Sequence, residues 1–216
     1  MPDARATAAP IARSPITVPG PRATTGGWEL STRRSAAALR LADISMLAKV
    51  NVRAAADGVL ARALGVPFLA SQRQDDALVV GSGPGEWLLV GAAGTADRLV
   101  ERVRGLAGGE FVTAVDLTHG RALVRLTGRD AARALSKVCA VDLSEAVTPE
   151  GTTFRTSVAK VATDVVRDDA GGGTGGPSYL LHCERSSGQY LFECLLDAGS
   201  EFGIEPAGSD LDGRGA

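Results

Sequence analysis

The sequence predicts an α+β fold in which antiparallel sheets are covered by helices, and three observations predict it. Short segments alternate apolar and polar residues, as half-buried strands do, and several follow one another closely enough to form hairpins. Between them lie short amphipathic segments that end at glycine, as helices often do. This order of elements occurs twice along the 216 residues. We therefore expect an internal duplication whose halves pack as one body, because either half alone would bury too small a core.

The first half, at about residues 39–108, contains strand, helix and hairpin patterns in that order. Gly65 is expected to end its first helix, and Thr95 is a suitable N-cap for its second. The expected elements are two strands, a helix, a hairpin and a second helix, at residues 39–45, 49–53, 54–65, 77–90 and 94–107.

Residues 81–85, Gly-Ser-Gly-Pro-Gly, are of the kind that forms either a phosphate-binding loop or a tight turn. A dinucleotide loop needs a strand before the glycines and, after them, a helix whose N-terminus faces the phosphates. Here residues 86–90 (Glu-Trp-Leu-Leu-Val) follow at once and have a strand pattern. The stretch therefore predicts a hairpin turn.

The second half, at about residues 112–205, repeats the order with a glycine-rich loop at 168–176. His119 and Gly120 are expected to turn a hairpin between its first two strands. Its last helix is expected to bury Tyr190, Leu191, Cys194 and Leu195 and to end at Gly203. The expected elements are strands at 112–118, 121–128, 153–158, 160–167 and 177–184, and helices at 129–138 and 187–202.

Composition excludes several classes of partner and location. The formal charge is −2, without the clustered Lys and Arg that nucleic acid or an anionic membrane surface calls for. No apolar run approaches the roughly 20 residues of a membrane span. The three cysteines, at 139, 183 and 194, show neither disulfide nor metal-ligand spacing, which favours buried thiols in a reducing, cytoplasmic compartment.

The two ends of the chain are expected to be flexible tails around a domain at residues 28–208. Residues 1–27 are rich in Ala, Pro, Arg and Thr and lack the apolar stretch of a secretory signal; residues 209–216 form the short C-terminal tail. Trp28 and Leu30, where the first tail ends, are candidate contacts with a partner protein, and ordinary core residues are the alternative.

Few residues suggest chemistry. His119 in a turn and His182 in a strand are expected to be structural, and Asp116 is expected to cap a turn. Asp168 and Asp169, at the start of the glycine-rich loop, are expected to be solvated. An anion site at residues 128–130, before a helix, is disfavoured by the carboxylate of Asp130. The sequence therefore assigns no catalytic residue and no metal ligand, and it leaves cofactor-binding residues unidentified.

Three segments resemble one family. Residues 126–167, LTGRDAARALSKVCAVDLSEAVTPEGTTFRTSVAKVATDVVR, resemble the folate-binding fold of the aminomethyltransferase (T-protein) family, and residues 41–54 and 194–208 are similar to its early strand pair and its Pro-Ala-Gly ending. Together they cover most of residues 39–208. The hairpin at residues 83–89 is similar to that of one member, the gamma subunit of heterotetrameric sarcosine oxidase.

The resemblance implies a T-protein-like fold without the C-terminal barrel. Because the family's acidic catalytic stretch has no counterpart in residues 140–166, it also implies a non-catalytic structural subunit. Its partners would be the alpha, beta and delta subunits of a complex that demethylates sarcosine and passes the one-carbon unit to tetrahydrofolate. FAD, FMN, NAD and tetrahydrofolate would be held by those partners. A free-standing folate- or pterin-binding protein and an inactive regulatory relative are the alternatives.

Overall fold

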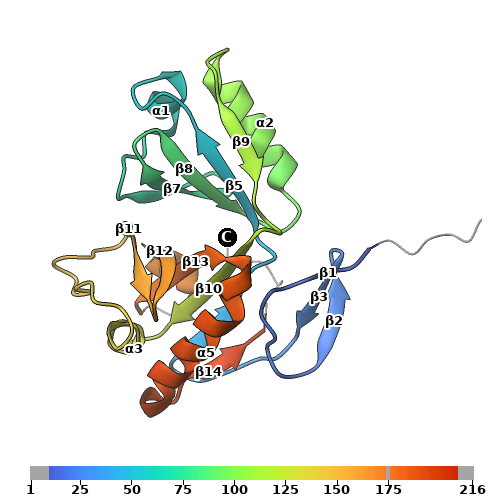
Figure 1. Ribbon diagram of the computed structural model, residues 1–216, viewed down its shortest axis with the longest axis vertical. Helices are drawn as coiled ribbons and strands as arrows, with labels where there is room; N and C mark the ends of the chain where they lie inside the picture. Colours follow the sequence, from blue (N-terminus) through green and yellow to red (C-terminus); the bar gives the residue numbers. More distant parts are fainter. Residues whose placement is uncertain (1–9, 174–175, 209–216) are drawn as a thin grey trace, which may run out of the picture.

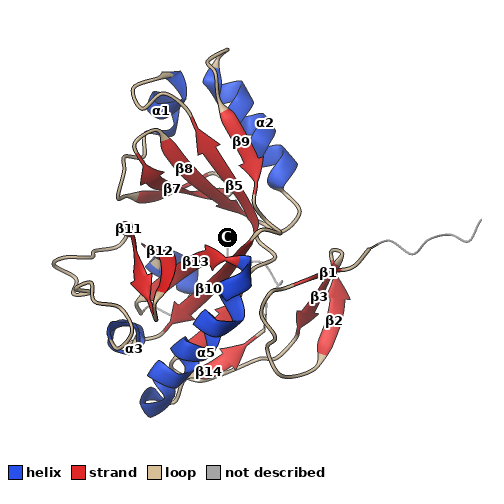
Figure 2. Cartoon of the chain, in the orientation of Figure 1, coloured by secondary structure: helices blue, strands red, loops and turns tan. Residues whose placement is uncertain are grey.

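The computed structural model describes residues 10–173 and 176–208 and contains two helix-backed sheets that face each other, with a smaller sheet beside the lower one (Figure 1). The helices lie on the outer sides of the two large sheets (Figure 2). The expected α+β class with largely antiparallel sheets is confirmed. The arrangement puts one apolar core under each helical layer and a third between the sheets.

The five-stranded sheet has α1 (Val59–Leu64) and α2 (Ala96–Ala107) on one face. α1 begins five residues later than the pattern predicts, but Gly65 ends it as expected, with a φ of 60°. Thr95 precedes α2 as expected, yet its hydroxyl bonds to Ala92 O and does not cap the helix. The strand order is β6 (Ser71–Gln74), β7 (Ala77–Gly83), β8 (Glu86–Gly91), β5 (Ala48–Arg53) and β9 (Thr113–Asp116).

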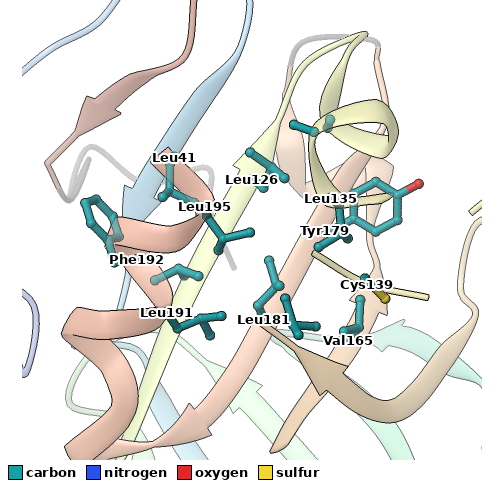
Figure 3. Close-up of a cluster of buried hydrophobic side chains, with 14 of the residues drawn as sticks. Leu41, Leu126, Leu135, Cys139, Val165, Tyr179, Leu181, Leu191, Phe192 and Leu195 are labelled. Carbon is teal, nitrogen blue, oxygen red and sulfur yellow. The ribbon is translucent and has the colours of Figure 1, made fainter. Parts of the chain in front are cut away.

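The six-stranded sheet carries α3 (Ala131–Ser136) and α5 (Gly188–Gly199) on its outer face. In Figure 3, Leu191 and Leu195 of α5 point toward Leu181 of the sheet. Tyr190, expected in this core, is instead half exposed. The strand order is β11 (Thr153–Val158), β12 (Val161–Arg167), β13 (Ser178–Glu184), β10 (Arg121–Thr127), β4 (Arg40–Asp43) and β14 (Glu205–Ala207).

Short helical turns complete this half. A single turn, α4 (Asp169–Gly172), stands where the glycine-rich loop was expected, and the turn η1 (Arg185–Ser187) precedes α5. A further turn, η2 (Ser200–Phe202), follows α5, and Gly203 ends it as expected, with a φ of 67°.

Two strands cross between the halves that the sequence delimits. β4 falls within the first repeat but pairs with β10 in the six-stranded sheet. β9 falls within the second repeat but pairs with β5 in the five-stranded sheet. His119 and Gly120 therefore join two sheets, and the expected hairpin at that point was wrong. Alternation within a strand says which face is buried, not which strand lies beside it.

The third core lies where the inner faces of the two large sheets meet. Strands in both sheets are apolar on both faces, because one face meets helices and the other meets the opposite sheet. The crossover from β4 to β5 adds three further apolar side chains to this layer. Its buried members are Trp28, Leu30, Ile44, Met46, Leu47, Leu78, Val80, Leu88, Val90, Leu123, Val166 and Leu180.

Residues 10–27 are built into the fold, which corrects the expected flexible tail over that range. β1 (Ala12–Arg13) and β2 (Arg22–Thr25) flank β3 (Trp28–Ser31) in the small sheet. Ile16 and Val18 are 5% and 3% exposed and join the core beneath α5. We call residues 10–33 the arm. The other expected tail segments, residues 1–9 and 209–216, lie outside the described residues.

The expected hairpin at residues 81–85 is confirmed, and close packing explains its glycines. Pro84 and Gly85 form the turn, and Gly85 has a φ of 69° that favours glycine. A Cβ on Gly81 would overlap the carbonyl oxygen of Pro67, because Leu69 N donates to Gly81 O at 3.2 Å. The stretch is glycine-rich because another backbone segment lies against it.

We expect Gly81→Ala to lower the free energy of unfolding by about 1–3 kcal/mol, because backbone must move to admit the methyl group. Gly83→Ala is the matched control: its Cβ would meet Glu86 Cβ at an ordinary 3.5 Å. Urea unfolding followed by circular dichroism measures both. Equal losses in the two variants would contradict the packing explanation.

Candidate functional site

A buried ionic cluster joins the two large sheets at the end of β12. Asp168 is 2% exposed and accepts two hydrogen bonds from Arg73 of β6, at 3.1 Å from Nε and 2.7 Å from Nη2. Arg125 of β10 donates to the same carboxylate at 2.7 Å and to Ser178 Oγ at 3.0 Å. Because Arg73 belongs to the opposite sheet, this clamp ties the halves together.

Asp168 was expected in solvent, and the structure corrects this. The glycines that suggested a loose loop are close-packed around the cluster. A Cβ on Gly171 would overlap Arg73 Nη2 and Asp168 Oδ2, and one on Gly172 would lie 2.7 Å from Ser178 Cβ. The available signal in the sequence was an acid-then-glycine run that follows a buried strand containing an arginine.

Asp169 is also less solvated than expected. It pairs with Arg167, which is 6% exposed and also donates to Thr148 O at 2.6 Å. Glu145 makes a second ion pair with the same guanidinium at 2.5 Å. This arginine therefore holds the segment that covers the outer edge of the six-stranded sheet.

His182 has a structural environment, as expected. Its Nδ1 lies 3.3 Å from Asp164 Oδ2, and Asp164 also pairs with Arg155 at 2.5 Å. Burial raises the pKa of the Asp164 carboxyl, but hydrogen bonds from His182 and Arg155 outweigh it and bring the pKa to about 2. Burial lowers the pKa of His182, so the ring is neutral at pH 7. Among the described residues its Nε2 has no hydrogen-bond partner.

Lys49 is a charged site that the sequence did not single out. It is 0% exposed, at the crossover between the sheets, and its Nζ donates to Ser45 O at 2.7 Å and Leu47 O at 2.8 Å. Burial lowers the pKa of Lys49 to about 7, against the opposing effect of Asp43 and Asp116. An alternating strand with one lysine on its buried face is the signal that would have found it.

Trp28 and Leu30, the predicted partner contacts, lie in the core between arm and sheets. They are 6% and 5% exposed, and the Trp28 ring stacks on exposed His119 with centroids 4.7 Å apart. This is the position of the core alternative, in which these residues attach the arm. A partner contact at either residue stays a prediction.

The remaining predicted residues have local roles. Asp116 caps its turn as expected, since Oδ1 accepts from Thr118 N at 2.8 Å. At the disfavoured anion site, Asp130 pairs with Arg133 at 2.8 Å. Cys139 and Cys183 are buried as expected, but Cys194 is partly exposed. Burial raises the pKa of Cys183 to about 11.

The arm also covers a polar cavity of about 170 Å³ against the six-stranded sheet. Asp43 of β4 is on its lining and is 4% exposed. Arg13 and Arg22 line it from the arm, and both pair with Glu29, at 3.0 and 2.7 Å. It is the concave site that residues from distant parts of the chain build together.

Two surveys bear on other site classes. In residues 10–173 and 176–208, no three His, Cys, Asp or Glu side chains are arranged to hold a metal ion. The described helices are all too short or too polar to cross a membrane.

Comparison with known sequences finds two matches. The profile of the GCVT N-terminal domain family matches residues 70–211. An aminomethyltransferase of Geobacillus thermodenitrificans (strain NG80-2) is 34% identical over 134 residues, which are 62% of this chain and 35% of that protein. The chain thus spans about a third of the length of this curated relative.

Solved structures have the same architecture. A chain of the heterotetrameric sarcosine oxidase from Corynebacterium sp. U-96, in complex with pyrrole 2-carboxylate, matches with a TM-score of 0.64 and 26% identity. That match covers 79% of this chain and 89% of the other. The glycine cleavage system aminomethyltransferase T from Bartonella henselae matches with a TM-score of 0.65 and 18% identity, over 88% of this chain and 56% of that one. The second match shows the fold alone.

Proposed function

The chain belongs to the GCVT N-terminal domain family and has the T-protein-like fold expected from the sequence, and on this premise we propose that it is a structural subunit of a sarcosine oxidase-like complex. In this proposal the chain corresponds to the gamma subunit. Alpha, beta and delta subunits are its partners in the cytoplasm, and they hold FAD, FMN, NAD and tetrahydrofolate. The complex demethylates sarcosine and transfers the one-carbon unit to tetrahydrofolate.

One observation carries the proposal. The match to a chain of a heterotetrameric sarcosine oxidase extends over 89% of that chain, whereas the aminomethyltransferases are matched over 35% and 56% of their lengths. A shared extent over nearly a whole subunit supports the same place in an assembly. The described buried charges are consistent with a structural role, because Asp168 and Asp164 are both occupied by arginines.

The second candidate is a free-standing folate- or pterin-binding protein of one-carbon metabolism. The observation in its favour is the 34% identity to an aminomethyltransferase, which exceeds the 26% to the sarcosine oxidase chain.

Affinity purification of the tagged full-length chain from its own cells separates the two. The subunit proposal expects large flavin-containing polypeptides to co-elute, together with sarcosine-dependent oxidase activity that the isolated chain lacks. A tag on an unrelated protein from the same cells is the control. A monomeric chain that elutes alone and binds tetrahydrofolate tightly would overturn the proposal in favour of the second candidate.

A further inference from the structure

The cavity beneath the arm is a pocket closed by a segment that lies outside the matched family domain. That domain begins at residue 70, whereas the arm comprises residues 10–33. The cavity volume of about 170 Å³ corresponds to roughly six waters at their liquid volume. A solute of the size of a small amino acid fits such a space.

The side chains of the pocket place opposite charges at different depths. The deep group is Asp43, whose carboxylate accepts from Ser45 N at 3.0 Å and is also hydrogen-bonded by Ser14. A carboxylate offers about four acceptor positions, so these bonds leave capacity for a further donor. The nearby Lys49 ammonium donates to two backbone carbonyls. An ammonium group from a ligand would offset the cost of burying this carboxylate.

The outer charges have the opposite sign. Arg13 and Arg22 share the single carboxylate of Glu29, which leaves one net positive charge at the mouth. Their side chains are 74% and 44% exposed, so both can turn toward an incoming anion. A guanidinium pairs well with a carboxylate because it donates two parallel hydrogen bonds.

We propose that the arm cavity binds a small amino acid zwitterion, with its ammonium at Asp43 and its carboxylate at Arg22 or Arg13. The two ends of such a ligand carry the charges that the depth and the mouth of the pocket lack. The proposal goes beyond the function above and does not require the chain to be part of an oxidase.

The attachment of the arm implies a second, structural readout. Arg185 donates to Arg13 O at 2.8 Å, and Thr17 N donates to Gln189 Oε1 at 2.7 Å, so the arm is held at separate points on the α5 side. A ligand bridging Asp43 and the arm adds a connection across the cavity. Amide hydrogen exchange of residues 13–18 should therefore slow when the ligand binds.

Titration calorimetry on the full-length chain, with glycine and sarcosine as probes, tests the proposal. We expect saturable binding at millimolar concentrations, weakened at least about 10-fold when either charge of the ligand is removed, as in N-acetylglycine or methylamine. Arg22→Gln, a partly exposed change, should weaken binding by a similar factor. Arg53→Gln, an exposed arginine that pairs with Glu86 in the other sheet, is the matched control and should leave it unchanged.

Three results would overturn the proposal: no saturable binding of either probe, equal binding of N-acetylglycine, or equal effects of Arg22→Gln and Arg53→Gln. Asp43→Asn should abolish binding, but this residue is buried and the variant could fail to fold. The comparison of ligands on the unaltered protein avoids that difficulty.

Discussion

Replacing Asp168 with asparagine is expected to lower the free energy of unfolding by about 3–5 kcal/mol, because it leaves two arginines without their shared counter-charge. Arg125 is 7% exposed and has no other carboxylate among its printed hydrogen bonds, while Arg73 is more accessible. Denaturant unfolding followed by circular dichroism measures the loss. Amide exchange should also quicken in β6, because its connection to the other sheet is weakened.

The matched control for this substitution is Asp75→Asn. Asp75 makes the same kind of pair, with Arg102 at 3.1 Å, but its side chain is 81% exposed. A surface pair of this kind contributes little, so the control should change stability by less than about 1 kcal/mol. If both variants lost the same small amount, the clamp would not be holding the sheets together.

Lys49→Met is expected to remove a pH dependence of stability. Burial lowers the pKa of Lys49 to about 7 in the folded state, against about 10.4 for an unfolded chain. Between these values the unfolded state binds more protons than the folded state, so the native protein gains stability as pH rises through this window. The slope approaches about 1.4 kcal/mol per pH unit at its steepest.

The measurement is denaturant unfolding at pH 7, 8 and 9, values that stay below the folded-state pKa of Cys183, about 11. The charged groups that act on Lys49 are Asp43, Asp116 and Arg185, and none of them is altered in the variant. Lys137→Met is the control, because Lys137 is 42% exposed and pairs with Glu201. The interpretation fails if wild type and Lys49→Met show the same slope.

Local patterns predicted much of the secondary structure. The turn at Pro84 and Gly85 and the end of α1 at Gly65 depend on backbone conformations that particular residues favour, so they were accessible to sequence reasoning. The capping role of Asp116 is local in the same sense, because it involves a neighbour two residues away.

The candidate sites were far less accessible. The Asp168 clamp joins residues 95 and 43 positions apart, and the arm cavity combines residues 13–31 with Asp43 and Gly208. Nothing adjacent to these residues marks them as partners. The same limitation explains why residues 10–27, with few apolar residues, were interpreted as a tail although Ile16 and Val18 enter the core.

The sequence by itself determined the α+β class, most strand and helix positions and the repeated element order, because these follow from side-chain periodicity and turn residues over a few positions. Only the tertiary structure decided that β4 and β9 exchange sheets, that the arm is docked, and that Asp168 and Lys49 are buried. Those outcomes depend on which distant surfaces meet, and the free energy of burying a charge or pairing a strand is set by the partner it finds there.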